Sequence, residues 1–237
     1  MQQIPQFPGL YPVLAVPGAD AALYVGMWSD CFPHLPDPGD HTGDLPLVHD
    51  PQLTVYGKSA TAHRAIGFFS DVSEGYNFSG QTTPINPMTP AMREITTGIN
   101  QYLANPIDPG RTAGIGTGYN AILVNLYRTG ADSIGPHSDK EIHLAPSGVF
   151  AYSCGAVRQF RVLARNPGQQ YYLGHNGSWV LHQATKADQV IVTVASSDRS
   201  VMLMWGAHFQ SLFKHAVPVE KTITQPRISW TWRCHNK

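Results

Sequence analysis

The sequence predicts one α+β domain over residues 1–237, in which helices come first and a predominantly antiparallel sheet, folded on itself, follows. Two patterns predict it. Apolar residues recur at helical spacing before residue 105, and after about residue 120 they alternate with a period of two. In addition, 22 glycines and 19 prolines are typical of a chain with many turns and short strands.

The N-terminal half carries the predicted helices. Residues 1–18 are rich in proline and are expected to form an extended arm, and Ala19–Trp28 is predicted to be an amphipathic helix. Phe32–Pro51 reads as a loop. A stronger helix begins at Thr89-Pro90, because threonine is a fair N-cap and proline is tolerated at the first helical position. Its apolar positions are Met92, Ile95, Ile99 and Leu103, and Asn105-Pro106 ends it.

The C-terminal half carries the predicted strands, separated by turn-rich segments. No internal repeat or clear linker interrupts it. The predicted strands are Ala121–Arg128, Val149–Ser153, Phe160–Leu163, Val190–Val194, Val201–Trp205 and Arg227–Arg233.

Composition limits the functional classes. There is no run of about 18 apolar residues, so we expect no membrane-spanning helix. The N-terminus lacks the pattern of a secretory signal. The three cysteines form no Cys-x-x-Cys pair, which favours a reducing, intracellular compartment, cytoplasmic or nuclear, and argues against a closed zinc site.

The net charge is zero but is unevenly distributed. Residues 1–57 contain six aspartates and no lysine or arginine, so the rest of the chain carries a formal +6. This charge would support only weak, salt-sensitive binding of nucleic acid, and a solvated mixed surface explains it equally well.

The first candidate site is the His-x-Asp of His137 and Asp139. Residues i and i+2 of an extended chain point the same way, so both side chains could bind one metal ion. Two histidines and one carboxylate are the ligands of non-haem Fe(II) oxygenases. A distant residue must supply the third ligand; His215 is the candidate and His208 is its rival.

Two further patterns lie on predicted strands. Arg227 and Arg233 share a face with Ser229 and Thr231, while Ile228, Trp230 and Trp232 take the other face. Arginines held inside a sheet need an anionic partner; the alternative is an edge strand with exposed arginines. Asn125 and Tyr127, again at i and i+2, could donate to carboxylate or keto oxygens, although a strand tyrosine is more often a packing residue.

The order of these motifs resembles the AlkB-like branch of the Fe(II)/2-oxoglutarate-dependent dioxygenases. The blocks that carry the resemblance are Asn125–Glu141, Gly155–Arg161, Met204–Gly206, His215–Pro218 and Arg227–Arg233. The likeness covers about residues 120–233 and is weaker upstream. There, Glu74–Gly80 looks like the family's nucleotide-recognition segment, and Leu14–Leu35 looks like its N-terminal helix.

The resemblance implies a double-stranded β-helix (jelly-roll) core over residues 119–233, with N-terminal helices packed outside and a helical and substrate-recognition part over 19–118. It implies that His137, Asp139 and His215 bind Fe(II), and that 2-oxoglutarate and O2 are cosubstrates. Arg227 would bind the distal carboxylate of 2-oxoglutarate, and Arg233 would lie near its 1-carboxylate and the substrate. The other implied cosubstrate residues are Asn125, Tyr127, Ser229 and Thr231, and the implied substrate-binding residues are Tyr76, Glu141 and Arg158.

Two features depart from the family pattern. Ser229 stands where an asparagine is common between the two arginines, so one cosubstrate contact is expected to differ. Residues 166–187 look like an insertion between strands. We interpret it as a structural hairpin, with a lid, a substrate-reading hairpin or a partner surface as alternatives.

The expected activity is oxidative removal of N-methyl groups from bases of DNA or RNA, such as 1-methyladenine and 3-methylcytosine, with release of formaldehyde and succinate by a monomeric enzyme. One alternative keeps the iron chemistry but hydroxylates a protein, lipid or small molecule. Another is a catalytically silent reader of modified nucleic acid.

Overall fold

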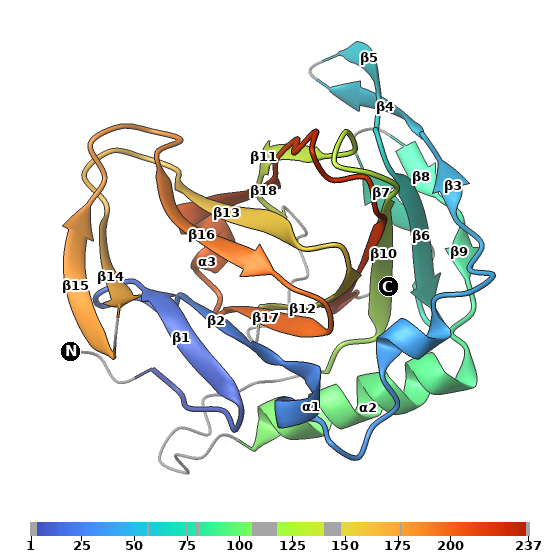
Figure 1. The fold of residues 1–237 in the computed structure, drawn as a ribbon, viewed down its shortest axis with the longest axis horizontal. Coiled ribbons are helices and arrows are strands. Elements are labelled where there is room, and N and C mark those ends of the chain that lie inside the picture. The colour runs from blue at the N-terminus through green and yellow to red at the C-terminus, as the bar shows by residue number, and fades with distance from the viewer. Residues whose placement is uncertain are drawn as a thin grey trace.

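The protein is mostly β in the computed structural model, which describes residues 4–55, 57–73, 75–78, 81–105, 118–139, 148–175 and 177–235. Two antiparallel sheets face each other and enclose an interior (Figure 1). This is the arrangement typical of the double-stranded β-helix, so the predicted jelly-roll core is confirmed. Within the described residues, no helix is long and apolar enough to cross a membrane.

The larger sheet has eleven strands, and its neighbours pair antiparallel except for β9, which runs parallel to β6. Its strands, in spatial order, are β15 (Ser178–Gln183), β14 (Gln170–His175), β1 (Leu10–Ala15), β2 (Ala22–Met27), β17 (Ser200–Trp205), β12 (Val149–Gly155), β19 (Arg227–Arg233), β10 (Ala121–Tyr127), β6 (Ala65–Ser70) and β3 (Val48–His49), with β9 (Ile85–Asn86) beside β6.

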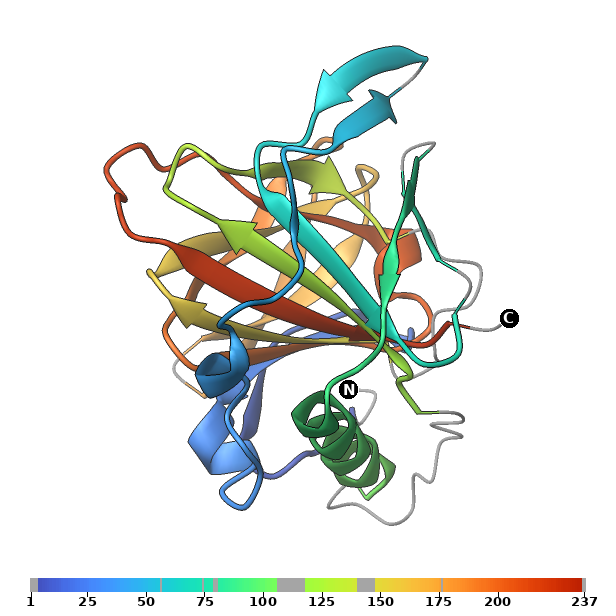
Figure 2. The ribbon, with the colours of Figure 1, turned by 90° about the vertical axis from the view of Figure 1, so that its right-hand side faces the viewer.

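The smaller sheet has the order β11 (Ile134–His137), β18 (Phe213–Val217), β13 (Arg158–Ala164) and β16 (Val190–Ser196). Its inner face packs on the larger sheet through one apolar cluster, to which β12, β13 and β17 all contribute. Two hairpins project from this body, β4 (Gln52–Val55) with β5 (Lys58–Thr61) and β7 (Tyr76–Phe78) with β8 (Gln81–Thr83) (Figure 2).

The long helix α2 (Pro90–Ala104) lies where the sequence predicts it, and its predicted apolar face is the buried one. The Thr89 hydroxyl accepts a hydrogen bond from the Met92 N–H at 3.2 Å, which caps the first turn. The four predicted apolar positions are buried, and they pack in one cluster with Trp230 and Trp232. The helix therefore covers the outer face of the larger sheet, and its Thr96 hydroxyl accepts from the Trp232 indole N–H.

The predicted helix Ala19–Trp28 is wrong. Ala22–Met27 is strand β2, paired with β1 on one side and β17 on the other, and α1 (Trp28–Cys31) is a single turn. The segment Leu14–Leu35 therefore does not form the long helix that the resemblance implied. The physical reason is burial on both faces: Ala22, Leu23 and Tyr24 are all inaccessible to solvent, and such a strand reads as a continuous apolar run that periodicity cannot separate from a helix.

The expected helical part, residues 19–118, is also corrected: its described residues hold the strands β2 to β9 and one long helix, α2. The predictions for the later strands, the loop and the insertion agree with the structure. All six predicted strands are present within two residues at either end. The predicted loop Phe32–Pro51 holds one short 3₁₀ turn, Pro38–His41, besides β3. The insertion 166–187 forms the hairpin β14–β15, which extends the larger sheet beyond β1, whereas the proline-rich arm supplies β1 itself.

Candidate metal and cosubstrate site

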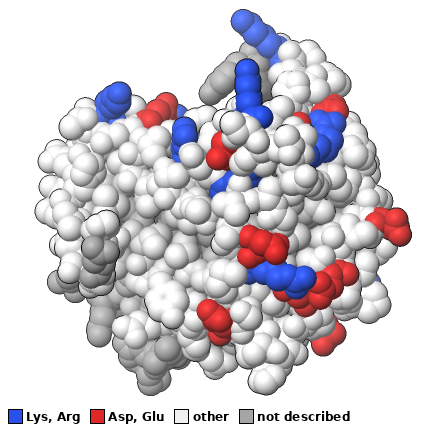
Figure 3. Space-filling view, in the orientation of Figure 1, with Lys and Arg blue, Asp and Glu red and all other residues white. Residues whose placement is uncertain are grey.

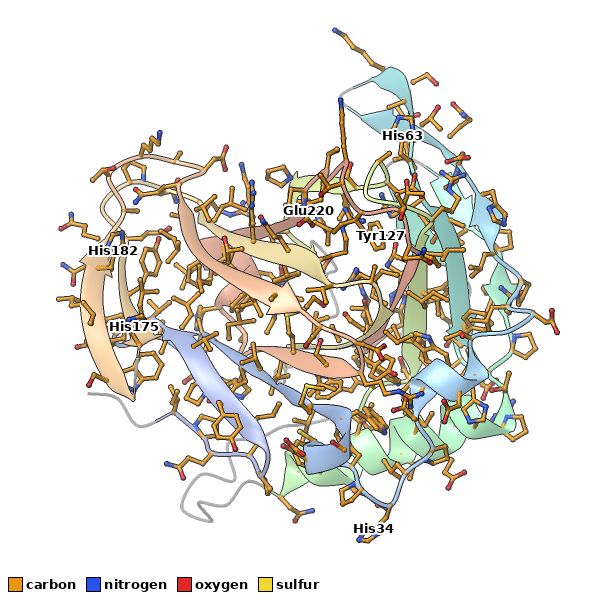
Figure 4. All side chains as sticks on the ribbon, viewed as in Figure 1. His34, His63, Tyr127, His175, His182 and Glu220 are labelled. Atoms are coloured by element: carbon orange, nitrogen blue, oxygen red, sulfur yellow. The ribbon has the colours of Figure 1, made fainter. Side chains whose placement is uncertain are left out.

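His137, Asp139 and His215 form one cluster in the interior. His137 ends β11 and lies directly opposite His215 in the neighbouring strand β18. One ligand atom from each of the three residues lies within 4.8 Å of the others. The rival His208 is exposed and precedes the short helix α3 (Phe209–Leu212). Other histidines, including His34, His175 and His182, lie at the periphery (Figure 4).

Local contacts orient the two imidazoles. The Nδ1 of His137 lies 2.9 Å from the Gly135 carbonyl oxygen, and only a protonated Nδ1 can donate to it, which leaves the Nε2 lone pair available to a metal. The ring of His215 stacks on Phe160, with centroids 5.5 Å apart and an angle of 23° between the planes. The two histidines are therefore positioned by the paired strands β11 and β18, and Asp139 follows two residues after β11.

The electrostatics suit a divalent cation. Burial lowers the pKa of His215 to about 3 and also lowers the pKa of His137. Burial opposes ionisation of Asp139, but the adjacent Arg233 guanidinium holds the pKa of this carboxyl below its usual value. At neutral pH the cluster thus presents two neutral imidazoles and one carboxylate.

One carboxylate oxygen of Asp139 is available to bind a cation. Arg233 Nη2 donates to Oδ1 at 3.1 Å, whereas buried Oδ2 has no hydrogen-bond partner within the described parts of the chain. A buried anionic oxygen without a donor is costly unless a cation binds it. The donor set and this orphaned oxygen fit Fe(II), for which two histidines and a carboxylate leave coordination positions open.

The loop between the two ligands is held by residues that sequence reasoning missed. Gln210 Oε1 accepts a hydrogen bond from the Asp139 backbone N–H at 3.0 Å. The Ser138 hydroxyl donates to the Phe213 carbonyl at 2.6 Å and accepts from Arg165 Nη2. These partners lie 27 to 75 residues from the loop in the sequence, so no local spacing indicates them.

The two arginines of β19 are buried, and the alternative of an exposed edge strand is wrong. β19 lies between β10 and β12, with Trp230 and Trp232 on its outer face. Arg227 and Arg233 are 3% and 4% exposed, and the buried residues Ser229 and Thr231 line the strip between them. Arg233 turns to the metal cluster, and Arg227 turns to a second, polar region of the interior.

Arg227 is a buried cation without an anionic partner in the parts of the chain that are described. Its Nη2 donates to the Ser153 hydroxyl at 2.6 Å and to the Ser196 hydroxyl at 3.2 Å, while Nε and Nη1 have no hydrogen-bond partner there. Burial lowers the pKa of Arg227, and Tyr127 opposes this shift. The guanidinium is thus poised to bind an anion, which would offset the cost of its desolvation.

Asn125 and Tyr127 lie on β10 beside these arginines. In the strand register Tyr127 is opposite Arg227, and Asn125 is opposite Ser229. Buried Arg64, which precedes β6, donates from Nε to Asn125 Oδ1 at 2.9 Å. Sequence reasoning missed Arg64, because its partner is 61 residues away in the chain.

The three predicted substrate residues differ in their surroundings. Arg158 is 1% exposed and donates to Glu220 and to the carbonyls of Thr129, Asp132 and Pro218, which ties loops to the smaller sheet. Tyr76 lies in strand β7 of the projecting hairpin. Glu141 lies outside the described residues.

Comparison with known proteins identifies the chemistry. The family model described as "2OG-Fe(II) oxygenase superfamily" matches residues 51–233, which include the metal cluster and both arginines. That description names the iron and the cosubstrate that the sequence predicted. Fe(II) and 2-oxoglutarate are thereby confirmed, and so is a dioxygenase of this class with His137, Asp139 and His215 as its facial triad.

The curated relatives confirm the AlkB-like resemblance. The DNA oxidative demethylase ALKBH2 of Homo sapiens is 27% identical over 183 residues, which cover 77% of this chain and 60% of that protein. The bovine ALKBH2 is 26% identical over the same length and is covered to 56%. The bovine alpha-ketoglutarate-dependent dioxygenase alkB homolog 3 is 31% identical over 119 residues, 50% of this chain and 37% of that protein. The chain thus spans less than two thirds of the length of these relatives.

Proposed function

Because the chain belongs to the 2OG-Fe(II) oxygenase superfamily, we propose that it removes N-methyl groups oxidatively from nucleic-acid bases, with 1-methyladenine and 3-methylcytosine as the substrate class. The observation that carries the proposal is the similarity over 77% of the chain to a protein named as a DNA oxidative demethylase. The metal triad and the two buried arginines lie within the matched region.

The triad would hold the iron. When bound, Fe(II), 2-oxoglutarate and O2 supply the oxidation: one oxygen atom is incorporated into succinate as CO2 is lost, and the other hydroxylates the methyl group. The hydroxymethyl group then leaves as formaldehyde: the N–C bond breaks, its electron pair returns to the base nitrogen, and the hydroxyl proton is released to solvent. The chain's own task is to bind, orient and exclude water.

The residues around β19 would bind the cosubstrate. Arg227 supplies two unused donors for the distal carboxylate, and Asn125 and Tyr127 supply neutral donors from the adjacent strand. Ser229 and Thr231 line the strip that runs from Arg227 to Arg233. At the far end, Arg233 donates to Asp139 and would also bind the 1-carboxylate of 2-oxoglutarate.

The substrate base would enter from the side of the projecting hairpins. The triad is buried or half-buried, so a base must leave the stack or come from a single strand to reach it. On the face seen in Figure 3, lysine and arginine side chains predominate along the edge where the β4–β5 hairpin stands, and acidic ones are more frequent on the opposite side. A basic edge favours the approach of a phosphate backbone.

The test is a panel of single- and double-stranded oligonucleotides, in DNA and RNA form, that carry 1-methyladenine or 3-methylcytosine. We expect Fe(II)- and 2-oxoglutarate-dependent loss of the methyl group by mass spectrometry, with formaldehyde and succinate in equal amounts. His137→Ala and Asp139→Ala should abolish both products. Glu141→Ala, at the position where the family places a base-contacting carboxylate, should impair demethylation while succinate formation without substrate persists.

The outcomes separate the three functions. Succinate formation without demethylation of any oligonucleotide would contradict the nucleic-acid substrate and point to hydroxylation of a protein, lipid or small molecule. Binding of methylated oligonucleotides without iron-dependent succinate would point to a silent reader.

A further inference from the structure

We propose that Arg64 is a positioning residue that fixes the side-chain amide of Asn125 with its N–H donors turned toward the cosubstrate. The inference concerns a residue outside the metal triad and outside β19. It rests on the proposed binding of 2-oxoglutarate beside Asn125.

The geometry places both partners in the protein interior. Arg64 is 4% exposed and Asn125 is 7% exposed, and Nε of the former lies 2.9 Å from Oδ1 of the latter. Asn125 stands in the middle of β10, opposite Ile66 in β6 and Ser229 in β19. Arg64 lies just before β6, so the bond reaches Asn125 from the side away from β19.

The chemistry of the pair permits one orientation. A guanidinium can only donate hydrogen bonds, whereas the amide of asparagine has an accepting oxygen and a donating nitrogen. The oxygen must therefore face Arg64, because a flipped amide would set donor against donor. The Nδ2 group is consequently turned away from Arg64, and its two N–H bonds suit the carboxylate or keto oxygens of 2-oxoglutarate.

The pairing of the strands does not by itself require the bond between Arg64 and Asn125. β6 and β10 are already joined by a ladder of six residue pairs, which includes Asn125 with Ile66. The Arg64 guanidinium can only donate hydrogen bonds, so it keeps the Asn125 amide from flipping.

The decisive experiment is a double-mutant cycle on 2-oxoglutarate affinity. The dissociation constant is measured by isothermal titration calorimetry of the Mn(II)-loaded protein, in which Mn(II) replaces iron without turnover. Arg64→Met should weaken binding about tenfold, the usual contribution of one hydrogen bond lost by an oriented group. Asn125→Ala should weaken it at least as much, and the double variant should bind like Asn125→Ala alone. The matched control is Arg93→Met. Arg93 is an exposed arginine of α2 that pairs with Asp71, and its loss should leave the affinity for 2-oxoglutarate unchanged.

Two results would overturn the inference. One is an Arg64→Met protein whose affinity stays within twofold of the wild type. The other is a double variant whose loss equals the product of the two single losses. If Arg64→Met does not fold, Arg64→Gln replaces it; glutamine can accept as well as donate, so it should also weaken binding, and unchanged affinity would contradict the proposal.

Arg227→Met separates this inference from the site on which it rests. If Arg227→Met loses 2-oxoglutarate binding while Arg64→Met does not, the result supports the proposed cosubstrate site and contradicts the proposed role of Arg64. If Arg227→Met binds 2-oxoglutarate like the wild type, the proposed cosubstrate site itself fails.

Discussion

Tyr127 lies directly opposite Arg227 in the β10–β19 ladder, and the guanidinium carbon of Arg227 is 5.2 Å from the centroid of the Tyr127 ring. The aromatic face attracts the cation but cannot neutralise it. Arg227 also donates hydrogen bonds to the hydroxyls of Ser153 and Ser196. The described residues therefore leave the buried charge of Arg227 without an anionic partner, and an anionic ligand would neutralise it.

Arg227→Met is expected to lower the affinity for 2-oxoglutarate by a hundredfold or more, since two charge-assisted hydrogen bonds would be lost at about 1.5–3 kcal/mol each. The free energy of unfolding of the ligand-free protein should stay the same or rise, because an unneutralised buried charge is removed. Calorimetry gives the affinity, and urea unfolding gives the stability. A strong loss of stability with unchanged affinity would show that Arg227 is structural.

His215→Ala is expected to abolish metal binding, because two ligands remain of three. We expect the dissociation constant for Mn(II) to rise by more than about a hundredfold, and the metal-induced rise in melting temperature to disappear. His208→Ala is the matched control and should bind metal like the wild type, since His208 is exposed. If His208→Ala loses metal binding and His215→Ala retains it, His208 is the third ligand. Removal of metal with a chelator should lower the melting temperature of the wild type to that of His215→Ala.

Gln210→Met is expected to loosen the metal loop, because the buried Asp139 N–H loses its acceptor. An unsatisfied buried donor costs about 1–3 kcal/mol, and support residues of this kind typically change metal affinity by about 10- to 100-fold. Urea unfolding and Mn(II) titration measure the two effects. Gln52→Met, on the exposed β4–β5 hairpin, should change neither. Unchanged metal affinity in Gln210→Met would show that the hydrogen bond serves the fold alone.

Stability is expected to fall in alkali because of Cys31. Burial raises the pKa of this thiol from its usual value near 9 to about 11. Between these values the unfolded chain releases a proton that the folded protein retains, so the folded state loses stability as pH rises from 9 to 11, by up to about 3 kcal/mol. Urea unfolding at pH 8 and pH 10.5 measures the loss. Cys31→Ala should show a smaller loss, and an equal loss would assign the effect to other groups.

Much of the site follows from local pattern. A strand alternates its side chains, so Arg-x5-Arg and Asn-x-Tyr predict one shared face each, and the structure places those faces in the interior beside each other. The same alternation predicts Trp230 and Trp232 on the opposite face, where they pack with α2. The N-terminal strands were not predicted, because Ala22, Leu23 and Tyr24 of β2 are all buried and show no alternation.

Local patterns were enough to predict the α2 helix, six of the strands after residue 120 and the ligand pair His137 and Asp139, because these depend on neighbours a few residues apart. Residue spacing could not choose between His208 and His215; the family resemblance implied His215, and the structure places it beside His137 and Asp139. The structure also shows that Arg227 is buried with no anionic partner among the described residues, and that Arg64 and Gln210 hydrogen-bond Asn125 and Asp139. Those contacts depend on which strands pair and in which register, and pairing is set by burial of the whole chain rather than by local spacing.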